Sequence, residues 1–182
     1  VGFDNRKNGL PPGGVDSYMS YGLSWANASN TPFRRYKHWV HEGGIATPFI
    51  ASWPAVIKKG GAITHQVGHI IDVMATCLDA AGVSYPAEFR GNEIQPLDGE
   101  SLVPAFRAPG WQRERPIYWE HEGNRAIRIG KWKLVAKGPV GPWELYDMQS
   151  DRTELNNLIE QRSDIADELR AKYDAWAERV GV

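Results

Sequence analysis

The chain has 182 residues, 42% of them hydrophobic and 24% charged, which is enough apolar material for a globular protein with a buried core. Its formal net charge of −1 excludes a field that would gather nucleic acid or anionic lipid by charge alone. No stretch approaches the roughly 18 apolar residues of a membrane span, and a single cysteine excludes an internal disulfide or a zinc site built from cysteines.

The N-terminal part of the chain has the composition of a loop. Residues 1–31 are rich in Gly, Pro, Asn and Ser without any period, which predicts a long loop. The first residues include neither a Met nor the apolar core of a signal peptide. We therefore expect a fragment whose true N-terminus, with any export signal, lies upstream.

The middle of the chain alternates between strand and helix patterns. Residues 47–54 form a short apolar run bounded by prolines, which predicts a strand buried on both faces of a sheet, and residues 67–71 predict another short strand. Asp72 is a suitable N-cap for a helix over residues 73–81. Cys77 lies on the apolar side of that helix, so we expect a buried thiol.

The pattern changes near residues 104–116, where we place a subdomain boundary between residues 1–114 and 115–182. Four short apolar segments then predict an antiparallel sheet, namely residues 117–119, 126–129, 132–135 and 144–146. A tight turn at Gly130-Lys131 joins the middle pair. Ser163 should cap a last helix, and its apolar stripe should lie on the sheet; the stripe consists of Ile165, Leu169, Tyr173, Trp176 and Val180.

A cluster of cationic or titratable side chains precedes the Gly-Gly pair at residues 43–44. Its members are Arg34, Arg35, Lys37 and His38. Ligands of open α/β sheets bind where loops meet strand ends, and clustered cations suit an anionic oxygen ligand. The cluster predicts an oxyanion site, with an ordinary solvated loop as the alternative.

Four blocks in order carry a resemblance to a known family. They are residues 36–44 (Tyr-Lys-His-Trp-Val-His-Glu-Gly-Gly) followed by Pro48 and Trp53-Pro54, residues 69–72 with 78–82, residues 97–102, and residues 143–147 with 153–158. In the first block, a lysine precedes Glu-Gly-Gly by five positions. The chain resembles the C-terminal part of sulfatases of the arylsulfatase type.

The resemblance implies an α/β fold of the alkaline-phosphatase-like kind, with a small C-terminal antiparallel sheet and helix. It implies hydrolysis of aryl or carbohydrate sulfate esters by a formylglycine made from Cys or Ser, beside a calcium ion with Asp and Asn oxygen ligands. The expected partner is a sulfate ester, without nucleic acid or a membrane span. A periplasmic or extracellular location follows from the resemblance alone.

The resemblance also assigns site residues. Lys37 corresponds to the catalytic lysine that contacts the substrate sulfate, where a compact ammonium can meet a sulfate oxygen. His38, His121 and Arg125 are further candidates for substrate binding, each with an ordinary structural role as the alternative.

Two elements of the family site depart from the family pattern in this sequence. Asp4 and Asn5 are candidates for metal binding, although the family pair follows an apolar strand and precedes Gly, whereas Arg6 follows here. The nucleophile motif, a Cys or Ser followed at fixed spacing by Pro and Arg, is absent. The chain alone is therefore expected to be inactive.

Two other functions stay open from the sequence. A phosphodiesterase or phosphonate hydrolase of the same superfamily would use the same metal and cationic groups on a phosphoryl group. A noncatalytic carbohydrate-binding module is suggested by the eight tryptophans alone.

Overall fold

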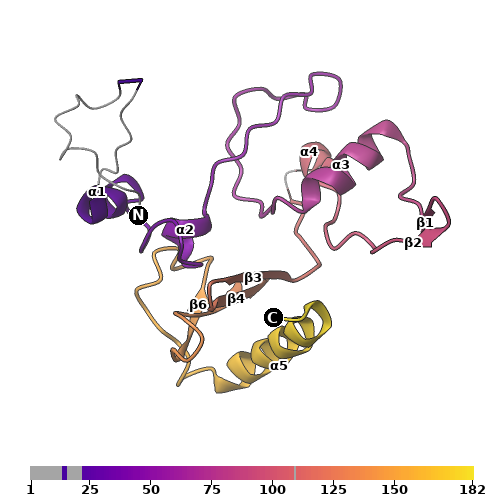
Figure 1. Ribbon diagram of the computed structural model, residues 1–182. Coiled ribbons are helices and arrows are strands. Elements are labelled where there is room, and N and C mark those ends of the chain that lie inside the picture. The colour runs from indigo at the N-terminus through magenta and orange to yellow at the C-terminus, as the bar shows by residue number, and fades with distance from the viewer. Residues whose placement is uncertain (1–13, 16–21, 109) are drawn as a thin grey trace. The chain divides into compact units, whose positions relative to one another are not determined.

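The computed structural model describes residues 14–15, 22–108 and 110–182 (Figure 1). It divides into two compact units, one formed by the described residues up to Thr47 together with Tyr118–Val182, and the other by the described residues of Pro48–Ile117. The predicted metal candidates Asp4 and Asn5 lie outside the described residues. No helix in the described part of the chain has the length and apolar character to cross a membrane.

The first unit is built on a four-stranded sheet with the order β3-β4-β5-β6. The strands are β3 (Ile117–His121), β4 (Asn124–Ile129), β5 (Trp132–Ala136) and β6 (Trp143–Asp147). Antiparallel pairing sets Ile127 opposite Leu134, and Leu134 opposite Leu145. The predicted sheet is confirmed, including the turn at Gly130, whose φ of 54° suits glycine.

Helix α5 (Ser163–Val180) covers one face of this sheet. Leu169 and Tyr173 are buried against Ile127, Leu134 and Leu145. The rings of Tyr118 and Trp176 stack at 4.9 Å with an interplanar angle of 3°. The predicted docking of the stripe is therefore confirmed.

Two details of the helix prediction are wrong. Val180 is exposed, because it lies in the last turn, beyond the side chains that pack on the sheet. The residue before the helix is Arg162, with no capping bond from its side chain. Ser163 is instead the first residue of the helix.

The opposite face of the sheet is covered by residues 33–47, which we call the motif segment. Its Val40 is buried with Ala126, Val135, Tyr146 and Met148. The segment ends in a single helical turn, α2 (Glu42–Ile45). Before it lies α1 (Gly22–Ser29), so the predicted loop over residues 1–31 is wrong there.

The second unit contains α3 (Asp72–Ala81), α4 (Val103–Arg107) and a small hairpin of β1 (Glu88–Phe89) and β2 (Asn92–Glu93). Helix α3 confirms the predicted helix, but the prediction of Asp72 as its N-cap is wrong, because the N-cap is Ile71 and Asp72 is the first residue of the helix. The Asp72 carboxylate accepts hydrogen bonds from the amides of His69 at 2.7 Å and Glu100 at 3.0 Å. It also pairs with Arg113 at 2.5 Å. Asp72 thus connects three segments of the unit.

Three expectations for the second unit are wrong. Residues 47–54 and 67–71 form no strand, and Phe49 and Ile50 are 64% and 91% exposed. The Cys77 thiol is exposed as well. An apolar run indicates a tendency toward burial, but a strand also needs a hydrogen-bonding neighbour. In the described part of this unit, β1 and β2 pair only with each other.

Replacing Leu169 by Ala should lower the free energy of unfolding by about 2–5 kcal/mol, because the side chain is buried between α5 and the sheet. The exposed Glu178 in the same helix provides the control, and Glu178→Ala should change it by less than about 0.5 kcal/mol. Urea unfolding followed by far-UV circular dichroism measures both. Equal small effects would mean that α5 does not dock on the sheet.

Candidate functional site

The base of the motif segment is fixed by a group of buried charges. Glu42, Lys133 and Glu154 are all buried. The Lys133 ammonium lies 3.0 Å from Glu42 Oε1 and 2.8 Å from Glu154 Oε1. The Glu42 amide donates to Glu154 Oε2 at 3.0 Å. Burial by itself raises the pKa of Glu42, but the charge and hydrogen bond of Lys133 outweigh it, and the pKa lies below its ordinary value.

The two glycines of Glu-Gly-Gly are required by close backbone packing. A Cβ on Gly43 would lie 2.2 Å from the carbonyl oxygen of Arg35, and one on Gly44 would lie 1.9 Å from that of Trp39. The Gly43 amide donates to the Arg34 carbonyl at 2.8 Å. The motif therefore folds back on the residues before it, and a side chain at either glycine would prevent this.

A second polar network supports the segment beside the first. Arg34 donates to the Tyr146 hydroxyl at 2.8 Å, and Tyr146 donates to Glu144 Oε2 at 2.6 Å. The buried His41 ring lies 3.3 Å from the same oxygen through Nε2. The hydrogen bond from His41, followed by that from Tyr146, lowers the pKa of Glu144 to about 2 against the opposing effect of burial. Burial and the Glu144 carboxylate raise the pKa of Tyr146.

The predicted cationic cluster therefore separates into two groups. Arg34 is part of the internal network, and the Arg35 guanidinium lies over the Trp39 ring at 5.0 Å. Lys37 is exposed on a turn and forms no ion pair with any described residue. His38 follows it, with Nδ1 2.6 Å from Glu122 Oε2. Lys37 and His38 lie together on this turn, which we call the tip of the segment.

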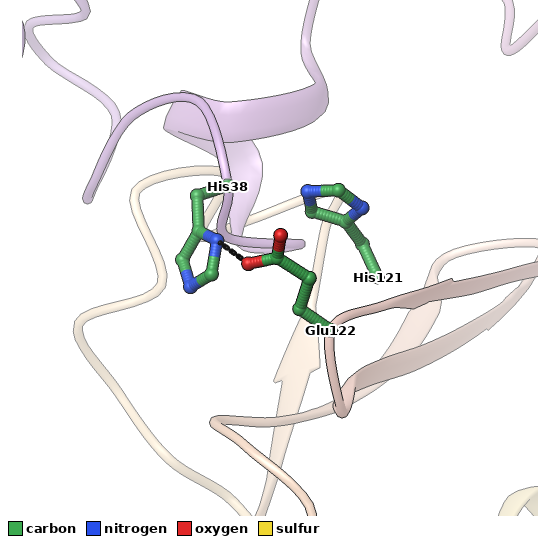
Figure 2. A group of neighbouring side chains, drawn as sticks. All are labelled: His38, His121 and Glu122. Carbon is green, nitrogen blue, oxygen red and sulfur yellow. Dashed lines mark ion pairs between the residues drawn. The ribbon is translucent and has the colours of Figure 1, made fainter. Parts of the chain in front are cut away.

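His38 and His121 lie close together, as Figure 2 shows, although they come from distant parts of the sequence. Their ring centroids are 5.6 Å apart. Arg125, the other candidate, donates to the Gly141 carbonyl at 3.1 Å and lies over the Trp143 ring at 4.6 Å. Strand alternation directs Arg125 to the face covered by α5, away from His38.

Several residues that organise this site were missed from the sequence. Glu42 and the glycines belonged to the recognised motif, but Lys133 and Glu154 lie far from them in the chain. The available signal was a lysine inside the apolar strand of residues 132–135, because a buried lysine needs carboxylate partners. Asn124, buried at the start of β4, gave no such signal.

Comparison with known proteins identifies the family of the chain. Residues 34–178 match the family described as N-sulphoglucosamine sulphohydrolase, C-terminal. The chain is 32% identical over 191 residues to an uncharacterised sulfatase of Schizosaccharomyces pombe, which covers 99% of this chain and 33% of that protein. Human N-acetylgalactosamine-6-sulfatase is 34% identical over 117 residues, or 64% of this chain and 21% of the human protein.

A solved structure extends the comparison to the fold. It is described under the metabolism of multiple glycosaminoglycans by Bacteroides thetaiotaomicron and has a TM-score of 0.64 at 21% identity, over 79% of this chain and 31% of that one. The fold is that of the C-terminal part of an alkaline-phosphatase-like sulfatase. The chain belongs to the sulfatase family. It spans about a third of the length of the Schizosaccharomyces pombe relative and of the solved structure.

Replacing Lys133 by Met should lower the free energy of unfolding by about 3–5 kcal/mol, because two buried carboxylates lose their neutralising ammonium. The control is Lys131→Met, since Lys131 pairs with Asp147 on the surface and should contribute less than about 1 kcal/mol. Thermal unfolding compares the two variants. A loss of similar size in both would contradict the buried charge group.

Acid should weaken the fold through Glu144. Its pKa is about 2 in the folded chain against an ordinary value of 4.5, so its contribution is present above about pH 4.5 and is lost as the pH falls toward 2. In Glu144→Gln, the unfolding free energy should be lower at pH 7 and should fall less steeply over this pH range. Parallel pH profiles for the variant and the parent chain would contradict the assignment.

Proposed function

We propose that this chain is part of a sulfuric ester hydrolase and that Lys37 binds the sulfate group of the substrate. The observation that carries the proposal is the contrast within the motif segment. Its base is fixed by the buried Glu42 and Lys133, whereas Lys37 is exposed at the tip. A fixed base with a free ammonium suits a group that must meet an anion from outside.

Lys37 would act on the charge that develops during ester cleavage. As the bond from sulfur to the bridging oxygen breaks, negative charge grows on the leaving oxygen and on the sulfate oxygens. A cation already in position stabilises that state more than the ground state, because little reorganisation is needed during the reaction. The rigid base of the segment supports such positioning.

We propose a carbohydrate sulfate as the substrate class. The human relative is named for N-acetylgalactosamine 6-sulfate, and a Bacteroides thetaiotaomicron relative, 31% identical over 128 residues, is named an N-acetylglucosamine-6-O-sulfatase. His38 and His121 are exposed or half-exposed at the same tip as Lys37. An imidazole has two ring nitrogens, and the N–H of the exposed His121 that binds no other group can donate to a sugar hydroxyl and so select the sugar.

We include a calcium ion and a formylglycine nucleophile in the proposal because the chain resembles sulfatases that use them. In the described residues, the group of three or more His, Cys, Asp or Glu side chains that could bind a metal is His38, His121 and Glu122. Two imidazoles and one carboxylate do not fit calcium, which prefers a set of oxygen ligands. Exposed Cys77 lies within α3 and lacks the Pro and Arg of the nucleophile motif.

In the full-length protein, Lys37→Ala should lower kcat on a sulfated monosaccharide by roughly 100- to 1000-fold, as for the loss of one group that stabilises the developing charge. The fold should survive, because Lys37 is exposed. Lys58→Ala is the control, since this exposed lysine donates to the nearby Ala55 carbonyl at 2.6 Å. Steady-state kinetics measure kcat and KM for both.

The control should keep its activity within about threefold of the parent protein, which corresponds to less than about 1 kcal/mol. If Lys37→Ala also stays within that range, Lys37 does not bind the sulfate and the site assignment fails. A rise in KM at constant kcat would assign Lys37 to substrate binding alone.

A further inference from the structure

Three side chains at the tip of the motif segment converge on one point (Figure 2). His38 comes from the motif segment, whereas His121 and Glu122 come from the end of β3 and the turn after it. One nitrogen or oxygen of each lies within 4.8 Å of those of the other two. The Glu122 carboxylate lies between the two imidazoles and contacts His38 Nδ1 at 2.6 Å.

A buried amide fixes the positions of both histidines. Asn124 is 1% exposed, and its Nδ2 donates to the carbonyl oxygens of His38 at 3.2 Å and His121 at 2.9 Å. Its Oδ1 accepts from the Gly138 amide at 3.0 Å. The two imidazoles are therefore held together through their backbones by one satisfied side chain, and their proximity does not depend on the surface ion pair.

The backbone around the cluster adopts an uncommon conformation for these residue types. His38 has a φ of 94°, and Glu122 has a φ of 51° in a two-residue hairpin turn with Gly123 at 82°. Such turns favour Asn, Asp or Gly at the first position, because a larger residue with positive φ is strained. Glutamate is unfavourable for the turn itself. Its carboxylate, however, reaches His38 from that position.

We propose that His38, His121 and Glu122 bind a divalent transition-metal ion, with Zn2+ as the best fit. Two imidazole nitrogens and one carboxylate oxygen are borderline ligands that suit Zn2+, and a water molecule would complete four-coordination. The bound ion connects the motif segment to the β3–β4 turn. It thereby restricts the loop that carries Lys37, whether or not Lys37 binds sulfate.

The test is calorimetric titration of Zn2+ into the full chain, freed of metal by chelation and carrying no histidine tag. A Cys77→Ser background removes the exposed thiol as a competing ligand. The expected result is one Zn2+ per chain and a higher melting temperature when Zn2+ is present. When Co2+ replaces Zn2+, we expect an absorption band in the visible range that is typical of a four-coordinate site. Failure to bind Zn2+ stoichiometrically overturns the proposal.

Two variants separate binding from folding. His121→Gln removes one ligand at an exposed position, and Glu122→Gly removes another while relieving the positive φ, so the latter should fold at least as well as the parent chain. Each should weaken Zn2+ binding by more than about 100-fold, beyond the loss expected for a supporting residue. Asn124→Ala should weaken it by about 10- to 100-fold.

The controls are matched to these changes. Arg90→Gly relieves the same backbone strain as Glu122→Gly, because Arg90 also has a φ of 51° and precedes a glycine with positive φ in a hairpin turn. His65→Gln removes an exposed histidine of the second unit. Both controls should bind Zn2+ like the parent chain. If His121→Gln and Glu122→Gly also do so, the three side chains are not the ligands.

Discussion

A buried lysine that two carboxylates must neutralise determines how the first unit is assembled. Removing the Lys133 ammonium from water costs several kcal/mol unless charged partners surround it. In the sequence, Glu42 lies before strand β5, which carries Lys133, and Glu154 lies after it. Both segments must therefore pack on the same face of the sheet. The motif segment is therefore held on the sheet face opposite α5 by ion pairs as well as by apolar contacts.

The same constraint sets the geometry of the tip. Glu42 is held by the buried Lys133, and the two following glycines pack so closely on the backbone of Arg35 and Trp39 that a side chain would not fit there. Asn124 then fixes His38 from the hairpin side. The charges of Glu42, Lys133 and Glu154 at the base pair with one another, whereas Lys37 at the tip forms no ion pair with a described residue.

The sequence predicted elements whose pattern is local. The sheet and its turn at Gly130 follow from alternating apolar residues, and α5 follows from its period. Contacts between distant residues, such as Lys133 with Glu42, have no local pattern, and no periodicity identifies Asn124. The predictions of a buried strand over residues 47–54 and of a buried Cys77 thiol were wrong for a related reason. An apolar run or helix face indicates a preference for burial without saying what covers it, and the described second unit leaves both exposed.

The division of the motif segment into a buried base and an exposed tip has an evolutionary consequence. Substitutions at the base act on folding, since they disturb buried charges and close backbone contacts. In the chain without bound metal, substitution of the exposed His121 acts on the surface and costs little stability. Ligand preference can then drift at the tip while the scaffold stays under separate selection. A segment built in this way can change the ligand that it binds without a change of fold.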